Sequence, residues 1–369
     1  MTSSYYYNDL SRNLYLEYAP RINSTKNFIM GTDGALLAFE AFYYGTGGKT
    51  RVELDKKRFT ERYSIPHNGS TFVVVLSRED VGDIKPQFEK DVKANCTKNF
   101  FHKLVKNEEL VKDEENKKAM AVCINKRVDK KSGGVVTEIV NIDDMNMETP
   151  ILTITAITFN ATLFENGTTE EDFFVPDSPK PKKKAVMMMK MKKASGVALV
   201  SGMEKELRAT TIKFLYNDSD GSSFIAIMPN NQPATKAELL NLLSTLDLER
   251  FLSSFQDTKC NYQSMPRFTT KTDVKLIKDL GNIKPLVDFS CAEFSNMFDR
   301  SGFVYEDGLE FCVKTTINNT NDINNDPIHV GTRRIEKFAP DIILNQPFLY
   351  FIVDCKHYIK AIGTFLEPC

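Results

Sequence analysis

Near its C-terminus the chain reads Gln-Pro-Phe-Leu-Tyr-Phe-Ile from Gln346 to Ile352. Aromatic and β-branched residues dominate this stretch, and they predict a β-strand that includes Leu349 to Val353. Five further strands are expected upstream. They cover Thr71 to Leu76, Ile151 to Phe159, the Lys/Met-rich stretch that follows, Ile212 to Tyr216 and Ser223 to Met228.

Helical composition marks several other segments, most of them in the first half of the chain. They are the leucines of residues 10–16, Ala35 to Tyr44, Pro86 to Val105 with Phe100-Phe101 as the start of a further strand, Glu108 to Val128, and Ala237 to Phe255. Because the helices cluster early and do not alternate with the strands, the pattern indicates an α+β fold with one large sheet-based domain.

The composition is that of a globular protein without a strong overall charge. The 369 residues include 48 basic and 49 acidic residues, for a net charge of −1, and 41% are apolar. Such a chain can build a sizeable core, but its overall field attracts neither nucleic acid nor an anionic membrane. Contact with a polyanion must therefore come from a local patch.

The N-terminus lacks the form of a secretory signal, and no apolar run approaches the roughly 20 residues of a membrane helix. The seven cysteines are widely spaced and form no Cys-x-x-Cys pair, which favours reduced thiols over disulfides or a zinc site. We therefore expect a cytoplasmic protein with no membrane partner. Leaderless secretion is the alternative.

Catalytic motifs are missing from the sequence. It contains no Walker loop, no Gly-x-Ser-x-Gly, no His-Glu-x-x-His and no Gly-x-Gly-x-x-Gly. The four histidines are scattered, and none has a partner in a motif. We expect no enzymatic activity, no cofactor and no metal site.

One segment, Pro176 to Lys193, concentrates positive charge. Its lysines include Lys182, Lys183, Lys184, Lys190, Lys192 and Lys193. Clustered ammonium groups raise the local potential, so this run predicts a patch that binds a polyanion or an import receptor. The alternative, which we favour, is a solvated loop leading into a strand in which Val186 and Met188 pack.

The segment from Glu306 to Pro347 contains few apolar residues suited to a core, and Asn and Asp are concentrated in the middle of its sequence. A compact domain seldom carries such a long loop unless the loop has a function or is disordered. This segment is therefore the most informative anomaly in the sequence.

Several blocks, taken in chain order, match one known pattern. They are Asn27 to Thr50, Ile124 to Val140, Ile212 to Pro229, Met265 to Phe268 with Leu276 to Leu280, and Gln346 to Ile352 with Glu367-Pro368. Together these blocks resemble the serpin family. The last block is the most specific, since it is similar to the family's Arg-Pro-Phe-Leu-Phe-x-Ile sequence. Because the blocks span nearly the whole chain, residues 1–369 are identified as a single, divergent serpin domain.

The resemblance implies a large central β-sheet, two smaller sheets, about eight helices and an exposed reactive-centre loop, with hinge and loop at residues 306–346. In inhibitory members a serine protease cleaves the loop and stays attached as an acyl-enzyme while the loop inserts as a new central strand. The implied partner is a serine protease, trypsin-like or chymotrypsin-like. We expect a monomer.

The resemblance also places the hinge of the loop. Its residues are Glu306, Gly308, Leu309, Glu310, Phe311, Cys312 and Val313. The family's Glu-x-Gly-x-Glu start is present, but the small residues that should follow are replaced from Phe311 onward. A bulky side chain passes slowly into a close-packed sheet. We therefore expect a slow or leaky inhibitor, and a non-inhibitory serpin-fold binding protein is the alternative.

Alternation of Leu309, Phe311, Val313 and Thr315 still predicts one buried strand face, so an inserted state fits the sequence. Other departures affect polar residues that control sheet opening in the family. Ser-Pro-x-Ser is replaced by Gly31-Thr32-Asp33-Gly34, the His by Phe298, Asn-Thr by Ala156-Ile157 and the Trp by Phe164. The short distance from Thr50 to Thr71 implies a short or absent fourth helix, so heparin-type activation is not assumed.

The position of the scissile bond is not fixed by the resemblance. Counting from the hinge places it near Asp322, whereas counting back from Pro347 places it near Glu336, so the loop carries an insertion. The candidates are Arg333 or Arg334 for a trypsin-like protease, Phe338 for a chymotrypsin-like one, and Asp322 for an Asp-specific one. We favour Arg334.

Overall fold

The computed structural model describes residues 3–23, 25–56, 71–79, 81–105, 114–134, 136–145, 151–160, 168–176, 180–191, 197–216, 221–230, 232–260, 263–276, 292–299, 304–305, 309–318 and 341–368. The chain divides into two compact units. The first comprises Met1–Leu14, Met30–Phe159 and Thr272–Thr316, and the second comprises Tyr15–Ile29, Asn160–Lys271 and Ile317–Cys369.

Eight α-helices lie within the described residues. They are α1 (Ser3–Tyr18), α2 (Thr32–Gly45), α3 (Gly48–Lys56), α5 (Pro86–Asn95), α7 (Glu114–Ser132), α8 (Glu204–Leu207), α9 (Lys236–Thr245) and α10 (Leu248–Ser253). Short 3₁₀ helices occur at Ala19–Arg21 and Asp143–Met145.

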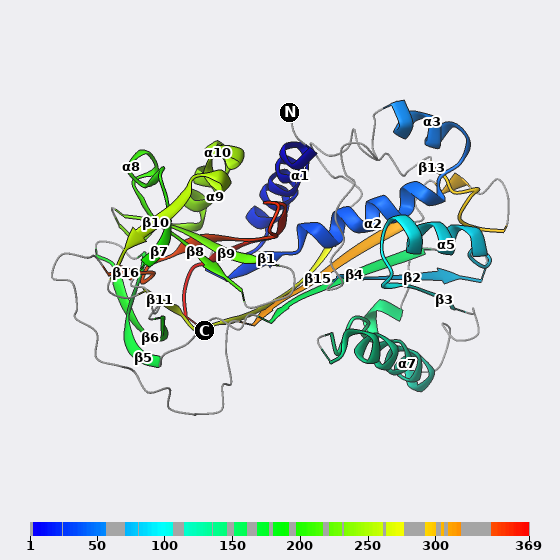
Figure 1. Ribbon diagram of the computed structural model, residues 1–369. Helices are drawn as coiled ribbons and strands as arrows, with labels where there is room; N and C mark the ends of the chain where they lie inside the picture. Colours follow the sequence, from blue (N-terminus) through cyan, green and yellow to red (C-terminus); the bar gives the residue numbers. More distant parts are fainter. Residues whose placement is uncertain are drawn as a thin grey trace. The chain divides into compact units, whose positions relative to one another are not determined.

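The first unit is built on a five-stranded sheet with the order β12-β15-β4-β2-β3. The strands are β12 (Thr269–Leu276), β15 (Leu309–Asn318), β4 (Ile151–Asn160), β2 (Thr71–Arg78) and β3 (Phe100–Val105). β2 pairs antiparallel with β4 and parallel with β3. A small sheet of β13 (Ala292–Glu293) and β14 (Val304–Tyr305) accompanies it. Figure 1 shows α2 and α7 on opposite sides of the five-stranded sheet.

Helix α2 covers one face of this sheet and is buried at every position except Tyr44. A helix that is apolar nearly all round is stable only inside a core. Its rings reach β15: the centroids of Phe39 and Phe42 lie 5.0 and 5.2 Å from that of Phe311. The α2 side of the sheet is therefore a dense aromatic layer.

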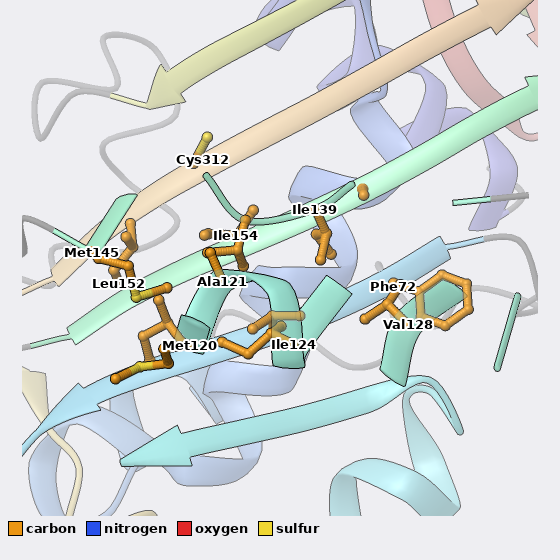
Figure 2. Packing of buried hydrophobic residues seen from close by; sticks show 14 of the residues in the cluster. Phe72, Met120, Ala121, Ile124, Val128, Ile139, Met145, Leu152, Ile154 and Cys312 are labelled. Carbon is orange, nitrogen blue, oxygen red and sulfur yellow. The ribbon is translucent and has the colours of Figure 1, made fainter. Parts of the chain in front are cut away.

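Helix α7 covers the other face with a narrow apolar stripe. Met120, Ala121, Ile124 and Val128 are buried, and their spacing puts them on one side of the helix. They join a cluster that also contains residues of four strands, among them Phe72, Leu152, Ile154 and Cys312 (Figure 2). The remaining surface of α7 is charged, as expected for a helix that lies on a sheet and faces water.

The second unit contains a seven-stranded sheet in the order β1-β18-β17-β9-β8-β7-β10 and a four-stranded sheet in the order β16-β11-β6-β5. The strands of the larger sheet are β1 (Phe28–Met30), β18 (Ile359–Phe365), β17 (Phe348–Val353), β9 (Ser223–Pro229), β8 (Ala209–Leu215), β7 (Val197–Ser201) and β10 (Phe255–Lys259). The smaller sheet consists of β16 (Ile342–Ile343), β11 (Gln263–Pro266), β6 (Lys182–Met191) and β5 (Thr168–Val175).

The C-terminal strand β17 lies between β18 and β9, and all six of its residues are buried. Burial on both faces explains why its sequence is a continuous apolar run. Tyr350 of β17 needs a glycine opposite it on β18, because a Cβ at Gly363 would lie 2.1 Å from Cζ of Tyr350. The strand predicted at residues 349–353 is therefore confirmed.

The other predicted strands are confirmed as β2, β4, β8 and β9, and β3 begins at Phe100 as expected. The single helix predicted over residues 237–255 is wrong. Thr235 forms a capping box with Glu238 at the start of α9, and the side chain of Asp247 caps a separate α10. Leu246 between them is extended, which ends α9. A cap inside a run of leucines thus divides the segment.

The lysine run was expected as a solvated loop leading into a strand in which Val186 and Met188 pack. The strand is confirmed as β6, which pairs with β5 and β11. It already begins at Lys182, so the loop expected for the first lysines is wrong for Lys182, Lys183 and Lys184. Val186 and Met188 are buried, as predicted. The strand can include these lysines because the sheet is open to water at their positions, where charged side chains are tolerated.

None of the helices in the described ranges is long and apolar enough to cross a membrane. Within those ranges the cysteines are free, namely Cys96, Cys123, Cys260, Cys312 and Cys355. Over the same residues, no three His, Cys, Asp or Glu side chains gather as they would around a metal ion.

Candidate functional site

The line between the neighbouring strands β4 and β15, called the seam below, is the candidate functional site. Side chains alternate between the two faces of a strand. On β15, Phe311 contacts α2 whereas Cys312 belongs to the cluster under α7. On β4, Thr155 lies against α2 and Ile154 belongs to the α7 cluster. Odd-numbered residues of both strands therefore face α2, and even-numbered ones face α7.

On the α2 face, the start of the helix meets β15 directly. The backbone N–H of Gly31 donates a buried hydrogen bond of 2.7 Å to Oγ1 of Thr315. A Cβ at Gly31 would lie 2.3 Å from Cγ2 of Ile157 and 2.9 Å from that hydroxyl oxygen. Gly31 is therefore required by the close approach of the helix to both strands of the seam.

Asp33 in the first turn of α2 collects two further hydrogen bonds. Its Oδ1 accepts from the hydroxyl of Tyr7 at 2.7 Å, and its Oδ2 accepts from Oγ1 of Thr71 at 3.1 Å. A carboxylate suits this place because the N-terminal end of a helix attracts negative charge. The helix is thus tied to α1 and to β2.

Two hydroxyl groups of β4 on the same face are poorly hydrogen-bonded. Oγ1 of Thr153 and Oγ1 of Thr155 are buried and have no hydrogen-bond partner among the protein groups that the structure describes. A buried hydroxyl without a partner costs about 1–3 kcal/mol. The seam is therefore less than optimally bonded on its α2 side.

On the α7 face, the seam carries a buried ion pair. Nζ of Lys314 on β15 lies 2.6 Å from Oδ2 of Asp144, and the two side chains are only 15% and 4% exposed. Asp273, which is half exposed, lies 3.6 Å away through its Oδ2. Burial lowers the pKa of Lys314, but the hydrogen bond and charge of Asp144 and the charge of Asp273 outweigh it, so the pKa lies above its ordinary value.

Cys312 is the neighbour of Lys314 on this face, and its thiol donates to Oδ1 of Asp273 at 2.6 Å. Burial, followed by the charge of Asp273 and this hydrogen bond, raises the pKa of the thiol well above its ordinary value. A thiol held in this protonated form is a poor nucleophile. Cys312 is therefore a packing and hydrogen-bonding residue at this site.

The structure places the predicted hinge only in part. Phe311, Cys312 and Val313 are buried within β15, and the backbones of Leu309 and Glu310 belong to the same strand. Glu306 and Gly308 lie outside the described residues, as do all four scissile candidates, Asp322, Arg333, Arg334 and Phe338. The buried strand face predicted from the alternation is present, and the assignment of a hinge to it stays a prediction.

The lysine run is brought into a sheet that supplies counter-charges. Lys183 lies 2.6 Å from Asp172 on β5, and Lys184 pairs with Glu367. Lys182 is exposed, the backbone of Lys190 belongs to β6, and Lys192 and Lys193 lie outside the described residues. Two of the described lysines are therefore paired with acidic neighbours, and a polyanion patch stays a prediction.

Sequence reasoning missed the polar residues that hold the seam. Phe298, expected in place of the family's His, forms a bridge with Ile84, while Thr315 bonds to the start of α2. The expected Phe164 lies outside the described residues. A lysine between Val313 and Thr315 in a largely buried strand was the available signal for the buried pair, but its partner Asp144 is 170 residues away.

The fold is shared with solved serpin structures. Uncleaved ovalbumin superposes with a TM-score of 0.70 at 14% identity, covering 100% of both chains. Serpin48, a highly specific serpin of the insect Tenebrio molitor, gives 0.71 at 16% identity over 100% of this chain and 98% of that one. Maspin gives 0.72 at 16% identity over 99% and 97%. Identities this low show the fold alone, and this α+β serpin fold is the predicted one.

A family model for serpins (serine protease inhibitors) matches residues 6–368. The chain therefore belongs to the serpin family, whose members are generally protease inhibitors and not enzymes. The match extends over both compact units. No curated protein matches the chain.

Proposed function

We propose that this chain is a suicide-substrate inhibitor of a serine protease, with slow or leaky kinetics. One observation carries the proposal: β15 leads out of the five-stranded sheet into residues 319–340, and the chain returns as β16 at the edge of the four-stranded sheet. A segment joined to a different sheet at each end stays attached to β15 when it is cut. It can then add a strand at the seam.

The chemistry belongs to the protease. Its serine attacks the carbonyl of the scissile residue, the peptide C–N bond breaks, and the new amino terminus leaves with the residues that follow. An ester then joins protease and inhibitor. Inhibition requires that the segment insert before water cleaves this ester, so slow insertion makes the protein a leaky inhibitor and more of a substrate.

Burial at the predicted hinge supports slow insertion. Phe311 packs between rings of α2, so moving it would break the contacts with Phe39 and Phe42. If β15 stays fixed, the moving segment must start beyond Asn318, which places the hinge later than predicted. The same burial favours the second candidate function, a non-inhibitory serpin-fold binding protein whose loop never inserts.

Incubation with trypsin-like and chymotrypsin-like proteases tests the proposal. We expect a covalent complex that survives SDS, and mass spectrometry of the cleaved chain should place the cut after Arg334. Arg334→Ala should abolish the complex with the trypsin-like enzyme, while Phe338→Ala serves as the matched control. Cleavage without a complex and without a gain in thermal stability would favour the binding protein.

A further inference from the structure

The Lys314–Asp144 pair joins two elements that meet at the seam. Lys314 belongs to β15, and Asp144 belongs to the segment that connects α7 to β4, the strand next to β15. We call residues 139–145 of this segment the connector. Separating β15 from β4 would pull the two charges apart in a place that water hardly reaches. Because breaking a buried pair leaves uncompensated charge, this contact resists opening.

The connector is itself held in shape around Asp144. The N–H of Asn141 donates to Oδ2 of Asp144 at 2.7 Å, and the N–H of Asp144 donates to Oδ1 of Asn141 at 2.9 Å. The carboxylate is therefore held in one position and cannot follow Lys314 if β15 moves. A small displacement of β15 would break the ion pair.

The other end of the connector is fastened to α7. Oδ1 of Asn125 accepts from the N–H groups of Ile139 and Val140, both at 3.0 Å, and its Nδ2 donates to the carbonyl of Val140 at 2.7 Å. One asparagine thus clips the connector to the helix. Helix, connector and β15 form a continuous chain of contacts across the seam, and the apolar cluster of Figure 2 lies beneath it.

We propose that the Lys314–Asp144 ion pair is a latch that keeps the seam closed by fastening α7 and its connector to β15. This inference rests on the proposed opening of the sheet. Asp273 lies on β12, on the side of β15 away from β4, so its contact with Lys314 does not cross the seam. Asn at position 144 would keep an oxygen that accepts from Lys314, whereas Met at position 314 would leave the buried charge of Asp144 unpaired. Removing the lysine should therefore loosen the seam more than removing only the charge of Asp144.

Hydrogen exchange of the intact protein, measured by mass spectrometry without protease, tests the latch. In Lys314→Met, peptides from β4 and β15 should exchange about tenfold faster or more, whereas peptides from β17 should keep the wild-type rate. Asp144→Asn should give a smaller acceleration of the same peptides. Lys314→Arg, which keeps the charge, should return exchange close to the wild-type rate.

Lys183→Met is the matched control, since it breaks a pair of the same 2.6 Å length at 62% and 54% exposure. It should leave β4 and β15 unchanged. Unchanged exchange in Lys314→Met would overturn the latch, and so would equal acceleration of β4, β15 and β17, which is global unfolding. Complex formation with a protease is measured separately. If the exchange results are as expected but no covalent complex forms, the inhibitor proposal fails and the latch stands.

Discussion

The two faces of the five-stranded sheet are held at the seam by different kinds of contact. On the α2 face, Gly31 brings a helix backbone within hydrogen-bond distance of Thr315 on β15, and this contact is neutral. The α7 face carries an apolar cluster and, between Lys314 and Asp144, a buried ion pair. One face is therefore fixed by shape and the other by charge. Added atoms should damage the first, and lost charge should damage the second.

The largest effect is expected from adding one methyl group to the α2 face. Gly31→Ala would place a Cβ 2.3 Å from Ile157 and 2.9 Å from the hydroxyl oxygen of Thr315. Overpacking of this kind should lower the free energy of unfolding by about 3 kcal/mol. Denaturant titration of the purified variant measures it.

The matched control is Gly202→Ala. A Cβ at Gly202 would make only an ordinary contact, 3.5 Å from the carbonyl oxygen of Ser254. Its free energy of unfolding should change by less than about 0.5 kcal/mol. Equal values for the two variants would show that the start of α2 is not held by shape.

A second prediction places a charge on the same face. Ser77 on β2 has the odd-numbered orientation of Thr71, and its Oγ lies 2.7 Å from Nε2 of His102 on β3. Burial lowers the pKa of His102 to about 4. The unfolded chain, with a pKa near 6.5, therefore binds a proton between about pH 6.5 and 4 while the folded protein does not.

Stability from this histidine is complete above pH 6.5 and falls as the pH decreases towards 4. In His102→Gln this part of the loss should vanish, so the difference in unfolding free energy between pH 7 and pH 4 should shrink by about 2 kcal/mol. Ser77→Ala keeps the titrating ring and should retain the loss. An unchanged pH dependence in His102→Gln would mean that the face accepts the charge.

The sequence predicted those elements whose signal is local. Residues 349–353 form a strand whose burial on both faces requires a continuous apolar run, and residues 151–159 form one that is rich in β-branched residues. Both signals are visible without any knowledge of the partner strand. The family blocks then fixed the fold. The break between α9 and α10 was missed because a run of leucines hid the capping role of Asp247.

The contacts that hold the seam could not be predicted, because each joins residues far apart in the chain. Thr315 meets Gly31 across 284 positions, and Lys314 meets Asp144 across 170. Side-chain patterns report which face a residue occupies but not which residue of another element it meets. The resemblance identified Phe298 as the replacement for a polar residue of the family, but it gave no sign that Thr315 bonds to the start of α2.

The smallest effect separates two threonines on the α2 face. The hydroxyl of Thr71 donates to Asp33, whereas that of Thr155 is buried with no partner among the described protein groups. Valine keeps the shape of threonine but lacks the hydroxyl. Thr155→Val should therefore raise the free energy of unfolding by up to about 1 kcal/mol, and Thr71→Val should lower it by about 1 kcal/mol. Thermal unfolding of the two variants gives the signs, and a loss of stability in both would mean that the hydroxyl of Thr155 is satisfied and that hydrogen bonding, not shape alone, holds this face.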